Sequence, residues 1–71
     1  MPDLPVLSGK QLVKALEKLG FEQLRQRGSH VVLRRGSRGT VVPLHKELKA
    51  GTLAGILRQA NVTREELAEA L

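Results

Sequence analysis

The sequence predicts an α+β fold, in which a helix is followed by a three-stranded antiparallel sheet and then by one or two helices packed on one face of the sheet. Apolar residues recur at helical spacing near both ends of the chain. Between them lie short strand-like runs separated by Gly-Ser pairs. Strands joined by short turns pair antiparallel, and the flanking helices then gather on one face. The chain has 71 residues, enough for a single domain over residues 1–71.

The first helix is expected over residues 8–19. Ser8 and Gln11 have the spacing of a capping box, in which the Ser hydroxyl and the Gln side chain each accept a hydrogen bond from the other residue's backbone N–H. Leucines then recur along one side at helical spacing. Gly20 stands where a left-handed residue commonly ends a helix.

The central third of the chain changes to strand character. Strands are expected at residues 21–27, 30–35 and 40–44, with turns at 28–29 and 36–39. The first strand is weak because Phe21 and Leu24 do not alternate cleanly, and the position of Phe21 suggests core. Pro43 cannot donate a ladder hydrogen bond, so the third strand should lie at a sheet edge or end there.

Alternation within the second strand separates its side chains into two sets. His30, Val32 and Arg34 share one face, and Val31, Leu33 and Arg35 share the other. One of these faces must pack on the helices.

The last third of the chain returns to helical spacing. A helix opens at Gly51-Thr52, and Asn61 is its expected end. Thr63 and Glu66 form a second capping box, which predicts a short final helix over residues 64–70.

Positive charge is concentrated in the predicted sheet. The chain has 12 Lys and Arg against 7 Asp and Glu, a formal charge of +5. Six cations lie between residues 25 and 46 without an intervening acid: Arg25, Arg27, Arg34, Arg35, Arg38 and Lys46. Such a one-signed surface attracts a phosphate backbone, although arginines also keep an exposed sheet edge soluble. The lysines at positions 10, 14 and 18 form either a solvated helix face or further phosphate contacts.

Several classes of protein are excluded or disfavoured by what the sequence lacks. It has no cysteine, which excludes disulfide scaffolds and thiol nucleophiles. Its size excludes large cofactor-dependent enzymes, and no cofactor is expected. No apolar run approaches the roughly 20 residues that span a bilayer, and the first residues lack the pattern of a secretion signal. We therefore expect a cytoplasmic protein without a membrane partner. Phe21 is the only aromatic residue, which argues against recognition of bases by stacking on exposed rings.

The two histidines are candidate catalytic residues. His30 follows the Gly28-Ser29 turn, and His45 follows the end of the third strand, beside Lys46. Histidine titrates near neutral pH, so it can take a proton from a ribose 2′-hydroxyl or protonate a leaving oxygen. A single histidine in a turn is more often a surface or capping residue than a catalytic one. Neither is accompanied by an acidic cluster, and two histidines alone make a poor metal site, so a catalytic role would be metal-independent.

The order of these motifs resembles the HicA toxins, small mRNA-cleaving proteins that are partnered by HicB antitoxins. The resemblance extends over nearly the whole chain, and its motifs are Leu7-Ser8-Gly9-Lys10, Leu16, Leu19-Gly20-Phe21, Arg27-Gly28-Ser29-His30, Val42-Pro43-Leu44-His45, Leu48, Gly51-Thr52-Leu53, Ile56-Leu57 and Ala60. The resemblance implies a fold like that of a double-stranded-RNA-binding domain. Family members often have an aromatic residue shortly after the motif histidine, whereas here Val31-Val32-Leu33 follows.

The resemblance also implies a function and a site. It implies a type II toxin that cleaves mRNA, with His30 as the essential histidine, His45 in a supporting role, and a HicB-like antitoxin that covers the active-site region. An oligomer in the antitoxin complex would fit this family. Gly28 and Ser29 would support the histidine, and Arg27, Arg34 and Arg35 would hold the phosphate or stabilise the transition state.

Two other functions stay open at the level of the sequence. The domain could be a non-catalytic RNA-binding module that recognises RNA by shape and phosphate contacts. The basic surface could instead dock an acidic protein and have no role with RNA.

Overall fold

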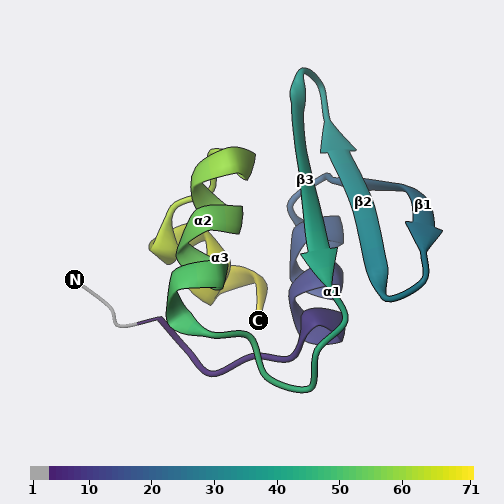
Figure 1. The fold of residues 1–71 in the computed structure, drawn as a ribbon. Helices are drawn as coiled ribbons and strands as arrows, with labels where there is room; N and C mark the ends of the chain where they lie inside the picture. Colours follow the sequence, from purple (N-terminus) through teal and green to yellow (C-terminus); the bar gives the residue numbers. More distant parts are fainter. Residues whose placement is uncertain (1–3) are drawn as a thin grey trace.

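The computed structural model describes residues 4–71 and has the predicted α+β order (Figure 1). The elements are α1 (Gly9–Lys18), β1 (Glu22–Arg27), β2 (His30–Arg35), β3 (Arg38–Pro43), α2 (Ala50–Ala60) and α3 (Arg64–Ala70). The three strands form one antiparallel sheet in the order β1-β2-β3. The predicted fold class is therefore confirmed.

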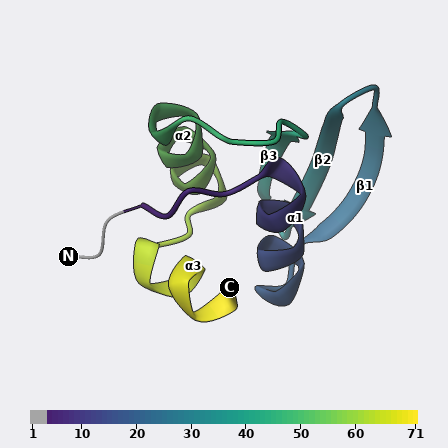
Figure 2. The same ribbon diagram turned by 90° about the horizontal axis from the view of Figure 1, so that it is seen from below.

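The helices leave one face of the sheet uncovered. Figure 2 shows α1 against one face of the sheet, with α2 and α3 beyond β3. α2 contacts β3, and α3 contacts α1. We call the face toward α1 the inner face and the opposite one the outer face; no described helix covers the outer face.

α1 has the boundaries that its capping residues predict. The Ser8 hydroxyl accepts a hydrogen bond from the Gln11 backbone N–H at 3.1 Å, and the Gln11 side chain accepts from the Ser8 N–H at 2.9 Å. Leu19 is the C-cap, and Gly20 follows with a φ of 97°, a conformation that favours glycine. The prediction for this helix is confirmed.

Both hairpins are closed by two-residue Gly-Ser turns. Gly28 and Gly36 have φ values of 59° and 60°, and the serines that follow have negative φ. Glycine at the first central position is the pattern of a type II′ turn, whose twist matches that of antiparallel strands. The predicted loop over residues 36–39 was too long, because two residues suffice and β3 already begins at Arg38. Pro43 ends β3, an edge strand, as its missing N–H predicts.

β1 is irregular where the sequence pattern was weak. Gln23 pairs with Leu33, but the next pair joins Arg25 to Val32, so Leu24 is an extra residue in a β-bulge. Phe21 lies just before β1 and is buried, whereas Leu24 is 51% exposed. Residues three positions apart point to opposite faces of a strand, which is why one of these two side chains is buried and the other exposed.

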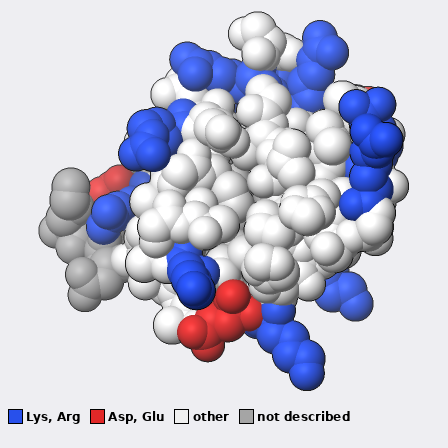
Figure 3. Space-filling model, viewed as in Figure 1, with Lys and Arg blue, Asp and Glu red and all other residues white. Residues whose placement is uncertain are grey.

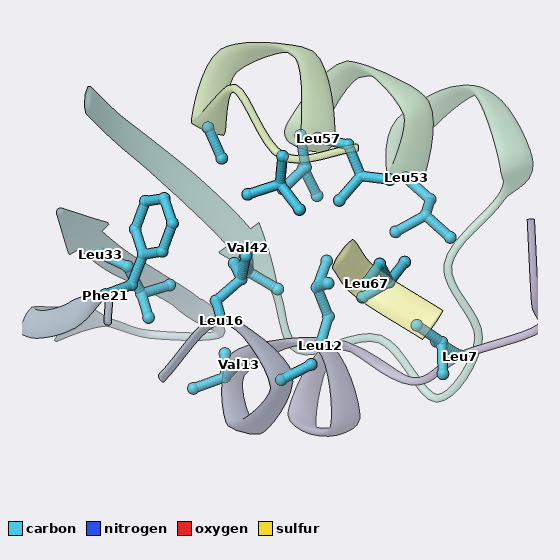
Figure 4. Packing of buried hydrophobic residues seen from close by; sticks show 14 of the residues in the cluster. Leu7, Leu12, Val13, Leu16, Phe21, Leu33, Val42, Leu53, Leu57 and Leu67 are labelled. Atoms are coloured by element: carbon cyan, nitrogen blue, oxygen red, sulfur yellow. The ribbon is translucent and has the colours of Figure 1, made fainter. Parts of the chain in front are cut away.

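The core lies between the inner face of the sheet and the three helices (Figure 4). The buried face of β2 is the one that carries Val31 and Leu33. These residues join a cluster whose largest fully buried members are Leu12, Leu16, Leu33, Leu53, Leu67, Val31 and Val42. Phe21 is part of the same cluster, as predicted.

The end of α2 and the start of α3 lie at the predicted residues. α2 starts one residue earlier than expected, at Ala50, without a side-chain cap, and Asn61 ends it in the left-handed region with φ 56°. The second capping box is formed by Thr63 and Glu66. The hydrogen bonds from the Thr63 backbone N–H and hydroxyl hold the pKa of the Glu66 carboxyl below its ordinary value of 4.5.

Candidate active site

The outer face of the sheet carries the His30 side of β2. His30 is the first residue of the strand and is exposed, and Val32 and Arg34 follow on the same face. Directly opposite residues in an antiparallel pair share a face, and Arg27 of β1 is opposite His30. Arg27 and His30 therefore occupy adjacent positions at one end of the outer face.

The turn that precedes His30 is fixed by hydrogen bonds on both sides. The Gln26 side-chain amide donates to the Gly28 carbonyl oxygen at 3.0 Å. The Ser29 carbonyl oxygen accepts from the Leu44 backbone N–H at 2.6 Å. Because Leu44 directly follows β3, this second bond joins the turn to the chain segment that carries His45.

The segment that carries His45 is in turn held by α1. The Gly9 backbone N–H donates to the His45 carbonyl oxygen at 2.9 Å. Gly9 is buried, and a Cβ built on it would lie 2.0 Å from the carbonyl oxygen of Pro43 and 2.8 Å from the Cα of Leu44. Only glycine allows the start of α1 to come so close to the end of β3.

Three segments that are distant in the sequence therefore meet at one end of the molecule. They are the 28–30 turn, the 43–45 segment and the beginning of α1. Sequence reasoning found both histidines but did not assign this role to Gly9. The available signal was a glycine at the first position of a helix, where its poor helix propensity calls for a packing explanation.

The predicted cations are divided between the two ends of the sheet. Arg27 is beside His30, and Arg25 pairs with Val32, two residues further along β2. Arg34 is four residues from His30 on the same strand, which places it about 13 Å away at ~3.3 Å per residue. It donates from Nε to the Gly36 carbonyl oxygen at 2.8 Å. Arg38 begins β3 at that far end, whereas Lys46 is exposed beside His45.

Arg35 is set apart from the other cations by its contacts. It is half-buried and donates from Nη1 to the Leu19 carbonyl oxygen at 2.7 Å. Its guanidinium lies over the Phe21 ring, 4.7 Å from the centroid, which is a cation–π contact. The structure thus places Arg35 as a tie between β2 and the end of α1, away from the outer face.

Lys and Arg side chains surround an uncharged region on one side of the molecule. Figure 3 shows blue side chains along much of the edge of this view and mostly uncharged atoms in its centre. On the outer face of the sheet, Glu22 is opposite Arg34, and no acid follows it in the sequence until Glu47. The lysines at positions 10, 14 and 18 are exposed along α1.

Among residues 4–71, no group of three or more His, Cys, Asp or Glu side chains is arranged to hold a metal ion. In the same range, every helix is too short or too polar to traverse a lipid bilayer.

Comparison with known proteins identifies one family. The family model described as "HicA toxin of bacterial toxin-antitoxin" matches residues 9–62. The matched range begins at the glycine that contacts the end of β3 and ends just after α2, so it contains both histidines and the whole sheet. A search of curated proteins found no match.

Proposed function

The chain belongs to the HicA toxins of bacterial toxin–antitoxin systems. On that premise, we propose that it is a metal-independent endoribonuclease that cleaves mRNA and uses His30 as a catalytic residue. The family match over residues 9–62 supports the class of activity. The single structural observation that carries the assignment to His30 is its exposed position beside Arg27, on a turn fixed at both ends.

The chemistry of RNA cleavage suits such a small site. The ribose 2′-hydroxyl is the nucleophile and attacks the adjacent phosphorus, while the 5′-oxygen of the next nucleotide leaves. The enzyme must accept a proton from the 2′-hydroxyl, give one to the leaving oxygen and stabilise the charge on the phosphoryl oxygens. We assign one of the two proton transfers to His30 and the stabilisation of charge to Arg27.

His45 and Lys46 have supporting roles in this proposal. The Ser29–Leu44 hydrogen bond joins the two histidine-bearing segments. This connection supports the proposal that His45 contacts the same RNA strand as His30. The cations at the far end of the sheet, Arg34 and Arg38, would bind phosphates further along the strand. A HicB-like antitoxin is the proposed inhibitor, and the cytoplasm is the proposed location.

RNA cleavage in the presence of a chelator tests the proposal. Wild type is expected to cut a structured mRNA fragment in EDTA, and His30→Ala is expected to lose at least 100-fold in rate, the contribution of one general acid or base. Far-UV circular dichroism checks that the variant is folded, and His45→Ala serves as the matched histidine control, with a smaller loss expected.

The alternative function predicts a different result in the same assay. A non-catalytic RNA-binding module would bind RNA in a salt-dependent manner and leave it intact. Equal cleavage by wild type and His30→Ala would refute the assignment of His30.

A further inference from the structure

A hollow beside β3 has no part in the proposed cleavage. It has a volume of about 500 Å³ and is lined by Val32, Val41, Thr40, Gln59 and the hairpin tip at residues 37–39. Val32 and Val41 are cross-strand partners on the outer face. Gln59 belongs to α2, which lies beside β3 (Figure 1). The hollow therefore extends from the outer face across the edge strand to α2.

The hollow is close to the residue assigned to cleavage. Val32 follows His30 by two residues on the same face of β2, so their Cα atoms are about 7 Å apart. Arg38, which we assign to phosphate contact, is in the hairpin tip that lines the hollow. An RNA strand with one phosphate at His30 and another at Arg38 would therefore pass over the hollow.

The walls of the hollow suit a flat group with an apolar face and a polar edge. Val41 is 44% exposed and Val32 is half-buried, so their methyl groups form an aliphatic surface. Binding sites of about 300–1,000 Å³ commonly combine such a surface with a few well-placed polar groups. A nucleobase has this shape and chemistry. Because the only aromatic residue, Phe21, is buried in the core, the base is not selected by stacking on a ring, and selection depends on its polar edge.

The amide group in the wall of the hollow is held in one orientation. Thr40 is 4% exposed, and a buried hydroxyl needs a hydrogen-bond partner. It donates to Oε1 of Gln59 at 3.0 Å, so the amide oxygen faces Thr40. Within residues 4–71, Nε2 of Gln59 donates to no other group, and the residue is exposed. Gln59 therefore presents a hydrogen-bond donor to a ligand.

A donor at this place distinguishes bases by one exocyclic group. Guanine carries the carbonyl oxygen O6, and uracil, like thymine, carries O4, whereas adenine and cytosine carry an amino group at the corresponding position. A glutamine that uses both ends of its amide binds adenine through oxygen and nitrogen together. Here the oxygen is engaged by Thr40, so the amino group of adenine or cytosine would meet a second donor.

We propose that this hollow is a base-binding subsite for the RNA substrate, in which Val32 and Val41 contact the ring and Gln59 donates from Nε2 to the carbonyl oxygen of uracil or guanine. The inference rests on the proposed function, because it takes RNA as the substrate. It adds a selectivity for a base near the cut, which the roles of His30 and Arg27 do not contain.

Cleavage of RNA oligonucleotides of random sequence tests the selectivity. The ends of the products are sequenced, and the ratio of uracil and guanine to adenine and cytosine is determined at each position near the cut. Gln59→Glu keeps an oxygen for Thr40 and presents a second oxygen in place of Nε2, so it should favour bases with an amino group. Gln23→Glu is the matched control, because Gln23 is exposed on β1, does not line the hollow and undergoes the same change in charge.

Wild type and Gln23→Glu are expected to favour uracil and guanine about fivefold at one position near the cut, which is the discrimination that one net hydrogen bond provides. In Gln59→Glu the ratio should fall to one or below, with a folded protein by circular dichroism. An unchanged ratio in Gln59→Glu would overturn the proposal, and so would a wild type without a preference.

A binding measurement separates this inference from the proposed function. Uracil and cytosine differ at the exocyclic group that Gln59 would contact, so affinities for oligouridine and oligocytidine of equal length are compared by fluorescence anisotropy. Wild type should bind oligouridine more tightly, and Gln59→Glu should lose that preference. If wild type showed this pattern but cleaved no RNA, the proposed function would be wrong and the base subsite would stand. Equal affinities of wild type for the two oligonucleotides would overturn the subsite even where RNA is cleaved.

Discussion

Replacement of Gly9 by alanine should destabilise the domain, although alanine is the better helix former. The new Cβ would lie 2.0 Å from the Pro43 carbonyl oxygen and 2.8 Å from the Leu44 Cα. Carbon and oxygen atoms in contact are ordinarily more than about 3 Å apart, so α1 and the end of β3 must separate by about 1 Å. Both obstructing groups are backbone, which has no rotamer to change.

The magnitude follows from three terms. Overpacking in a tight site costs about 1–3 kcal/mol. The 2.9 Å hydrogen bond from the Gly9 N–H to His45 would lengthen to about 3.9 Å and be lost, at about 1 kcal/mol. The higher helix propensity of alanine than of glycine offsets about 1 kcal/mol of this loss. The net loss is about 2 kcal/mol, which lowers Tm by about 8–16 °C in a domain of this size.

Thermal unfolding followed by circular dichroism measures this loss. Gly51→Ala is the matched control, because Gly51 is also near the start of a helix and a Cβ there would meet no atom within 4 Å. We expect Gly51→Ala to melt at or slightly above the wild-type temperature. If Gly9→Ala melted at or above the wild-type temperature, the close approach of α1 to β3 would be refuted as a requirement of the fold.

Two further outcomes are expected. Arg35→Gln should lower Tm, because it removes a charge-assisted hydrogen bond and a cation–π contact. Arg27→Gln should instead leave Tm within a few degrees of wild type and slow RNA cleavage. Thermal melts and cleavage rates of both variants check this prediction, and the reverse pattern would contradict it. The lowered pKa of the Glu66 carboxyl means that its contribution to stability is present above the ordinary value of 4.5 and is lost as pH falls through the folded-state pKa. The Tm difference between wild type and Glu66→Gln should therefore be larger at pH 7 than at pH 3, and a difference independent of pH would contradict the role of the charge.

The features that the sequence predicted well depend on residues that are close together in the chain. The capping box of Ser8 and Gln11, two residues only three positions apart, determines where α1 begins. The Thr63–Glu66 box does the same for α3. Asn61 ends α2 through its own tolerance of the left-handed region. Local patterns of this kind are readable because neighbouring side chains and backbone groups alone decide them.

The features that the sequence did not predict depend on which segments meet in three dimensions. The alternation of side chains along β2 predicted that Arg34 and Arg35 lie on opposite faces. It did not predict that Arg35 lies toward α1 and donates to the Leu19 carbonyl oxygen, because that depends on where α1 packs. The bulge at Leu24 is defined by the register of β1 against β2, which the residues of β1 alone do not determine. The closeness of Gly9 to the segment of His45 joins residues 36 positions apart, and no local pattern reports such a contact.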